Sequence, residues 1–127
     1  MILAINLLYN IDMCIVIKVN DLDWDVIFKN QIEFKKRLGN LDDDSTYLGL
    51  TLSDLDQVWL SEELQKDSLL YRTIKHELTH VYIESYGFGQ FSNFTEENVA
   101  DFVECYAEKI VNDSKSIFAQ VIKDRTK

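Results

Sequence analysis

The chain has 127 residues, of which 46% are hydrophobic and 28% charged, and this balance excludes a disordered or low-complexity protein. The length predicts one domain over residues 1–127. Thirteen Lys and Arg against 22 Asp and Glu give a net charge of −9, which argues against a nucleic-acid-binding protein because such proteins carry a basic surface.

Residues 1–19 are strongly apolar, yet they match neither a signal peptide nor a membrane span. No Lys or Arg precedes Lys18, whereas a secretory signal begins with a basic segment. Three polar residues interrupt the apolar run well short of the ~20 residues that a spanning helix needs. We therefore expect a cytoplasmic protein without a membrane partner, in which residues 2–8 and 13–19 form buried strands.

The two cysteines, Cys14 and Cys105, lie far apart in the chain and lack the paired spacing of a disulfide framework or a zinc knuckle. We expect buried thiols in a reducing compartment. Met1 and Met13 are both possible translation starts.

Short strands and one helix are predicted in the first half of the chain. Residues 23–28 alternate into an apolar end and predict a strand, and residues 29–38 predict a weakly amphipathic helix. After a turn at residues 40–45, the segments 47–52 and 57–61 predict two strands of a hairpin-like unit.

Helices are predicted in the second half. From residue 67 apolar side chains recur at intervals of three and four, which predicts a helix over residues 67–86 that ends at Gly87. Thr95 is a suitable N-cap for a second helix extending to about residue 112, and a third helix is predicted over residues 114–124. These elements together predict an α+β fold, in which a small twisted antiparallel or mixed sheet of about four strands packs against helix 67–86 and one or two C-terminal helices.

The chemistry-bearing motif is H-E-x-x-H at residues 76–80, inside the predicted helix 67–86. Residues four apart lie one turn apart on the same helix face, so His76 and His80 can bind one cation. Glu77 projects beside that face and can take a proton from a metal-bound water. The alternative interpretation is a solvated helix face with two surface histidines.

A catalytic zinc site needs three protein ligands, and the chain has only two histidines. The third ligand is therefore expected to be an acid, with Cys105 or a tyrosine less favoured. The helix after Thr95 carries several acids, which otherwise form an ordinary solvated face: Glu96, Glu97, Asp101, Glu104 and Glu108.

The sequence resembles the gluzincin metallopeptidases over about residues 45–110. The resemblance rests on V-W-L-S at 58–61, T-I-K-H-E-L-T-H at 73–80 and T-E-E-N-V-A-D-F at 95–102, with E-x-x-x-D inside the last segment. It is most similar to the small ImmA/IrrE-like and phage-type minimal members.

The resemblance implies a role for each matching residue. His76 and His80 would be zinc ligands, Glu77 the general base and Glu97 the third ligand. Asp101 would accept a hydrogen bond from a ligand imidazole. It also implies that the strand around residues 58–61 is a sheet edge on which an extended substrate adds as a further strand.

Two departures from the family pattern leave roles open. The short interval from His80 to Glu97 keeps Glu96 and Asp101 as possible ligands. The chain also has no spare histidine to stabilise the oxyanion. Tyrosines are the remaining donors, although each is also a plausible packing aromatic: Tyr86, Tyr82, Tyr47 and Tyr106.

We expect a zinc-dependent endopeptidase of narrow specificity that acts on a protein or peptide, and the resemblance suggests a regulator of a mobile element as substrate. The alternative is a catalytically silent zinc-binding regulator that uses its acidic surface, since residues 42–67 hold eight acids and one base. A structural zinc is less favoured because such sites usually close with a fourth protein ligand.

Overall fold

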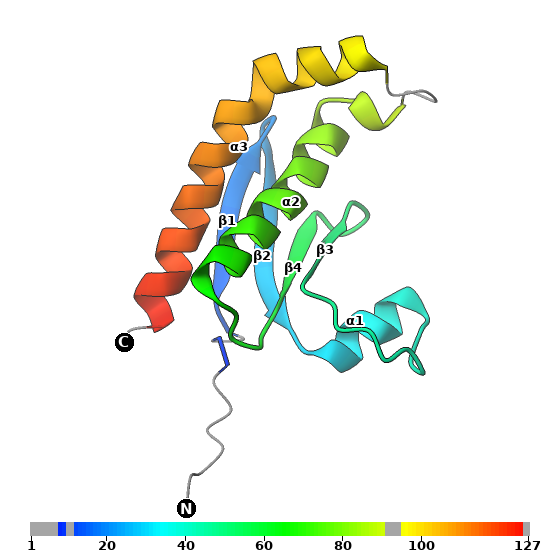
Figure 1. The fold of residues 1–127 in the computed structure, drawn as a ribbon, viewed down its shortest axis with the longest axis vertical. Coiled ribbons are helices and arrows are strands. Elements are labelled where there is room, and N and C mark those ends of the chain that lie inside the picture. Colours follow the sequence, from blue (N-terminus) through cyan, green and yellow to red (C-terminus); the bar gives the residue numbers. More distant parts are fainter. Residues whose placement is uncertain (1–7, 10–11, 91–94, 126–127) are drawn as a thin grey trace, which may run out of the picture.

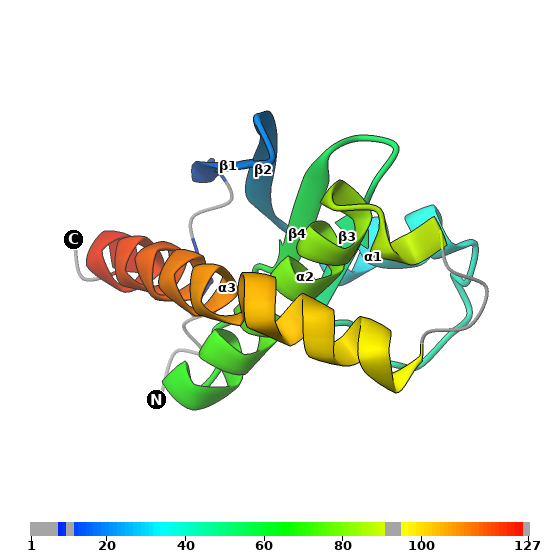
Figure 2. The same cartoon turned by 90° about the horizontal axis from the view of Figure 1, so that it is seen from above.

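The computed structural model describes residues 8–9, 12–90 and 95–125. A four-stranded sheet carries helices α2 and α3 on one face and α1 on the other (Figures 1 and 2). The strands are β1 (Cys14–Val19), β2 (Leu22–Lys29), β3 (Gly49–Leu52) and β4 (Gln57–Ser61). The helices are α1 (Gln31–Leu38), α2 (Asp67–Ser85), the short 3-10 helix η1 (Phe88–Gln90) and α3 (Glu96–Arg125). The predicted α+β fold with its mixed sheet is confirmed.

The order of strands in the sheet is β1-β2-β4-β3. The β1–β2 and β3–β4 pairs are antiparallel, whereas β2 and β4 are parallel. The expectation that residues 58–61 form a sheet edge is therefore wrong, because β4 lies between β2 and β3. Val58, Trp59 and Leu60 are all buried, as expected of a strand covered on both faces. Within the described residues β3 forms the edge on this side.

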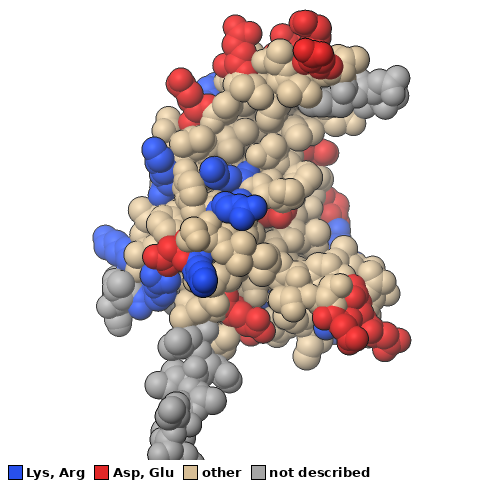
Figure 3. Space-filling model, viewed as in Figure 1, with Lys and Arg blue, Asp and Glu red and all other residues tan. Residues whose placement is uncertain are grey.

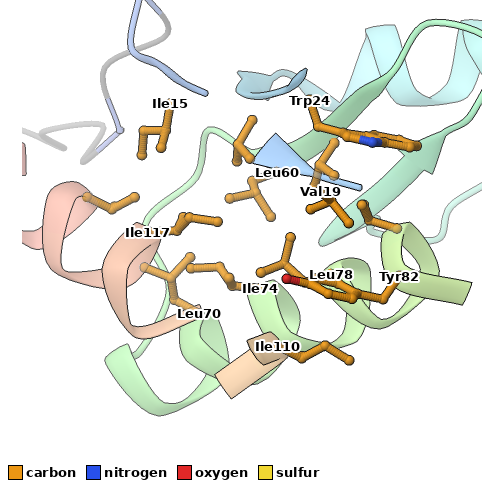
Figure 4. Close-up of a cluster of buried hydrophobic side chains, with 14 of the residues drawn as sticks. Ile15, Val19, Trp24, Leu60, Leu70, Ile74, Leu78, Tyr82, Ile110 and Ile117 are labelled. Carbon is orange, nitrogen blue, oxygen red and sulfur yellow. The ribbon is translucent and has the colours of Figure 1, made fainter. Parts of the chain in front are cut away.

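The main core lies between the sheet and the two long helices. The stripe predicted from the spacing of apolar residues faces inward: Leu70, Ile74 and Leu78 of α2 pack toward Leu60 of β4 (Figure 4). This burial turns the opposite face of α2 outward. A smaller cluster on the other side of the sheet joins Phe34 of α1 to its neighbours.

The C-terminal part is one 30-residue helix, not the two helices predicted with a break near residue 113. No glycine or proline interrupts the chain there. Ser114 is buried and its hydroxyl donates to the carbonyl of Ile110 at 2.6 Å, so this polar side chain is satisfied inside the helix. Ile117 and Val121 continue the inward stripe beyond it.

Both cysteines are free and exposed, which corrects the expectation of buried thiols. In β1 the inward positions are Ile15 and Val19, so Cys14 points to the other side of the strand. In α3 the buried positions nearest to Cys105 are Phe102 and Ile110, and Cys105 faces away from them.

At the N-terminus, the predicted strand 13–19 corresponds to β1, and Leu8 forms an isolated β-bridge with Glu63. The rest of the predicted strand 2–8 lies outside the described residues. Of the helices in the described ranges, none is long and apolar enough to cross a bilayer.

Candidate metal and catalytic centre

His76 and His80 lie one turn apart on the exposed face of α2. Their Nε2 atoms are 3.3 Å apart and their ring centroids 4.9 Å apart. Two zinc–nitrogen bonds of ~2.0–2.1 Å in tetrahedral geometry separate the nitrogens by about 3.3–3.4 Å. The two imidazoles therefore already have the spacing of a zinc-chelating pair.

Glu77 lies beside the pair on the side of α2 that faces β3, and only 7% of it is exposed. Its Oε1 accepts a hydrogen bond from the Thr51 hydroxyl at 2.9 Å, and its backbone carbonyl oxygen lies 3.1 Å from the same hydroxyl. A buried carboxylate needs such a donor, because burial without one is costly. Thr51 thus links the edge strand to the motif helix and fixes one carboxylate oxygen.

Gly49 allows β3 to approach α2 this closely. A Cβ at position 49 would lie 2.9 Å from Glu77 Cγ, 3.0 Å from its Oε2 and 3.0 Å from Thr73 Cγ2. These separations are shorter than van der Waals contact, so any larger residue would push the strand and the helix apart. Gly49 and Thr51 were not identified from the sequence, since their partner lies more than 25 residues along the chain.

Two hollows flank Glu77 along the groove between α2 and β3. The first, of about 530 Å³, lies on the His76 side and extends along residues 46–49. The second, of about 270 Å³, lies on the His80 side and extends along Leu50, Thr51 and Ser53. Because Glu77 lines both, its carboxylate sits between them, next to the two imidazoles.

The predicted third ligand is not gathered with the histidines. Glu96 and Glu97 lie in the first turn of α3 and Asp101 one turn later, and all three are exposed. Over residues 8–9, 12–90 and 95–125, no group of three His, Cys, Asp or Glu side chains is arranged to hold a metal ion. The structure thus brings His76, Glu77 and His80 together, and the roles of Glu97, Glu96 and Asp101 stay predictions.

The start of α3 is held by local contacts. The Thr95 hydroxyl accepts a hydrogen bond from the backbone N–H of Asn98 at 3.2 Å, which confirms Thr95 as the N-cap of α3. In return, the side-chain Oδ1 of Asn98 accepts from the backbone N–H of Thr95 at 3.0 Å. Further along, Phe102 packs edge-on against Phe88 of η1 with 5.2 Å between centroids. The cap defines where α3 begins, and the ring contact joins its first turns to η1.

Tyr86, the predicted oxyanion donor, ends α2 within an aromatic cluster. Its ring stacks on Tyr106 at 4.2 Å and on Tyr82 at 5.8 Å between centroids. The Tyr82 hydroxyl donates to Asp113 Oδ2 at 2.5 Å, and burial raises the pKa of Tyr82. None of the three tyrosines lines either hollow. The oxyanion role of Tyr86 stays a prediction.

Tyr47 lies on the wall of the first hollow, with His76 and Glu77. Its hydroxyl donates to Asp43, and this hydrogen bond, together with one from the Ser45 backbone amide, lowers the pKa of Asp43 to about 2. Its backbone is held by Gln31, whose Oε1 accepts from the Tyr47 amide at 2.8 Å and whose Nε2 donates to the Tyr47 carbonyl at 2.7 Å. Of the four tyrosines weighed as oxyanion donors, Tyr47 is the one beside the motif.

No model of a known protein family, no curated protein and no solved structure matches this chain. The resemblance to gluzincins therefore stays a prediction. What the site can do is argued below from its own geometry.

Proposed function

We propose that the protein is a zinc-dependent endopeptidase. The observation that carries this proposal is the placement of two imidazole Nε2 atoms 3.3 Å apart beside a buried carboxylate, at the edge of a sheet. His76 and His80 would hold the zinc ion, and Glu97 remains the proposed third ligand. When bound, zinc would supply a Lewis acid and lower the pKa of a bound water.

Glu77 would act as the general base. Its carboxylate takes a proton from the attacking water, the water oxygen bonds to the peptide carbonyl carbon, and the C–N bond breaks. The proton then passes from Glu77 to the leaving amine, so the products are a carboxyl group and a free amine. Since the Thr51 hydroxyl occupies Oε1, we assign the proton transfer to Oε2.

The substrate would lie along β3. Within the described part of the chain β3 pairs only with β4, so its outer backbone groups are available to an extended peptide. A peptide in that position passes both hollows and the histidine pair. Extended binding of this kind places a backbone carbonyl, rather than a side chain, at the centre of the site.

Third-ligand binding would require the start of α3 to approach the histidines. Such a shift would disturb the contact between Phe88 of η1 and Phe102 of α3, which joins the two elements. The free energy of that shift would be subtracted from the zinc affinity.

Among the residues that the structure describes, no acid lies with the two histidines, which favours a second candidate, a zinc-binding regulator without catalysis. Exposed acidic side chains gather at the start of α3 and in the loop after α1 (Figure 3), where a cationic partner would bind. In this case zinc held by the histidine pair would stabilise the fold or contribute to partner binding, and no reaction would be catalysed.

Proteome-wide mapping of new protein N-termini separates the two candidates. Cells expressing the wild type would be compared with cells expressing Glu77→Gln, which keeps the shape of the side chain and removes the base. We expect a small set of new N-termini in wild-type cells that is absent with Glu77→Gln, while both proteins bind zinc equally. Identical sets of N-termini with equal zinc loading would contradict the peptidase and favour the regulator.

A further inference from the structure

The outward face of α2 carries a polarised row of side chains. Arg72, His76, His80 and Glu84 follow one another at intervals of four residues, and all four are exposed. Neighbours at this spacing lie one turn apart on a helix, and the row turns by about 40° at each step. Arg72 and Glu84 nevertheless both line hollows beside β3. The row therefore begins with a cation, passes through the histidine pair and ends with an anion.

The two hollows repeat this polarity. Among the described residues, the first is lined by Arg72 and Lys75, with the buried Glu77 as its one acid. The described lining of the second includes Glu84 and Glu77 but no Lys or Arg. The protein has a net charge of −9, so a hollow lined by two cations differs in the sign of its charge from the protein as a whole.

The charged side chains beside the two hollows differ in their contacts. Lys75 Nζ lies 4.7 Å from the centroid of the Tyr71 ring, which holds this cation beside the first hollow. Neither Arg72 nor Glu84 takes part in any of the four ion pairs found in the described ranges.

Strand β3 runs in the same direction as the row. Residues 46–49 line the hollow at the Arg72 end, and Leu50 to Ser53 line the hollow at the Glu84 end. Arg72 and Glu84 are twelve positions apart, which is about 18 Å along a helix and about five residues of an extended chain.

We propose that the site takes an extended peptide carrying an acidic residue at the Arg72 end and a basic residue at the Glu84 end, about five positions apart, on either side of the histidine pair. The charge of the peptide would select both the substrate and its direction along β3. Cleavage of the bound peptide rests on the proposed function. The preference for one arrangement of charges concerns peptide binding alone.

The test is a titration of the isotopically labelled full chain, followed by amide NMR, with three capped hexapeptides. The first has Lys at its first position and Glu at its last, the second has the reverse order, and the third has Gln at both ends. All three have Ala elsewhere. We expect one charged order to bind roughly threefold or more tightly than the other, the scale of two exposed ion pairs. Shifts should concentrate at residues 46–53 and on α2.

The double variant Arg72→Glu/Glu84→Arg should invert this preference, because it reverses the row at constant net charge. The matched control Glu108→Lys/Lys115→Glu exchanges two exposed charges on α3 and should keep the wild-type preference. Equal binding of the two orders, no shifts with any peptide, or a preference unchanged in the first double variant would overturn the inference. Failure of the proposed peptidase function would show separately. In that case the double variant would still invert the charge preference, but the zinc-loaded wild type would not cleave the preferred peptide.

Discussion

At the scale of single residues, the placement of the motif follows from local geometry. Positions 76 and 80 lie on one face of any helix, and the inward stripe at Leu70, Ile74 and Leu78 determines which face is solvated. These facts are present in the sequence, and the prediction of a paired histidine face holds. The contacts that position Glu77 come from β3, and no local pattern predicts them.

Replacement of Thr51 tests the support of the proposed base. Thr51→Val keeps the shape of the side chain and removes the hydroxyl that Glu77 accepts from. We expect the free energy of unfolding to fall by about 1–3 kcal/mol, the cost of leaving a buried polar group without a donor. Thr51→Ser retains the hydroxyl and should stay closer to the wild type, as measured by urea unfolding. Equal losses in the two variants would show that methyl packing, rather than the hydrogen bond, is what Thr51 provides.

Gly49 provides a test of the close approach between β3 and α2. Gly49→Ala places a methyl group 2.9 Å from Glu77 Cγ, and we expect it to lower the free energy of unfolding by about 1–3 kcal/mol. Gly89→Ala is the matched control, because its new methyl group meets its nearest atom at 3.6 Å. Chemical denaturation of both variants measures the difference. A Gly49→Ala variant as stable as the control would mean that the strand does not lie where the structure places it.

At the scale of elements, the sequence predicts well where strands and helices occur. It predicts less well whether a helix is continuous and which strands pair with one another. The interval from residue 112 to 114 resembles a break because Asn, Asp and Ser favour helix ends. Ser114 instead donates to its own helix, and the apolar stripe continues through Ile117. The edge position of β3 depends on the parallel pairing of β2 with β4, a long-range contact that alternation along one strand does not reveal.

The start of α3 is the element on which the proposed third ligand depends. Glu97→Ala should weaken zinc binding roughly tenfold or more, and Glu96→Ala should change it much less, because only one of two adjacent helix positions can face the histidines. Competition for zinc against a chelating dye measures both affinities. A larger loss with Glu96→Ala would reassign the ligand, and no loss with either would exclude this turn of α3 from the site.

At the scale of the whole molecule, the charge of the groove differs from the overall net charge. Exposed acids gather at the start of α3 and in the loop after α1 (Figure 3). The groove between α2 and β3 carries the histidine pair, with two cations at one end and Glu84 at the other. The net charge of −9 therefore predicts little about the groove. Composition excludes broad classes of partner, but the local sign of the charge depends on which side chains the fold brings together.

The central claim is that His76 and His80 bind one zinc ion. The most direct measurement is zinc titration of the metal-free chain against a chelating dye, together with metal analysis of the purified protein. We predict one zinc per wild-type chain, loss of binding in His76→Ala and His80→Ala, and retained binding in the control Cys14→Ser/Cys105→Ser, which removes both exposed thiols. A folded wild-type chain that binds no zinc, or that loses zinc only in the cysteine variant, would contradict the account.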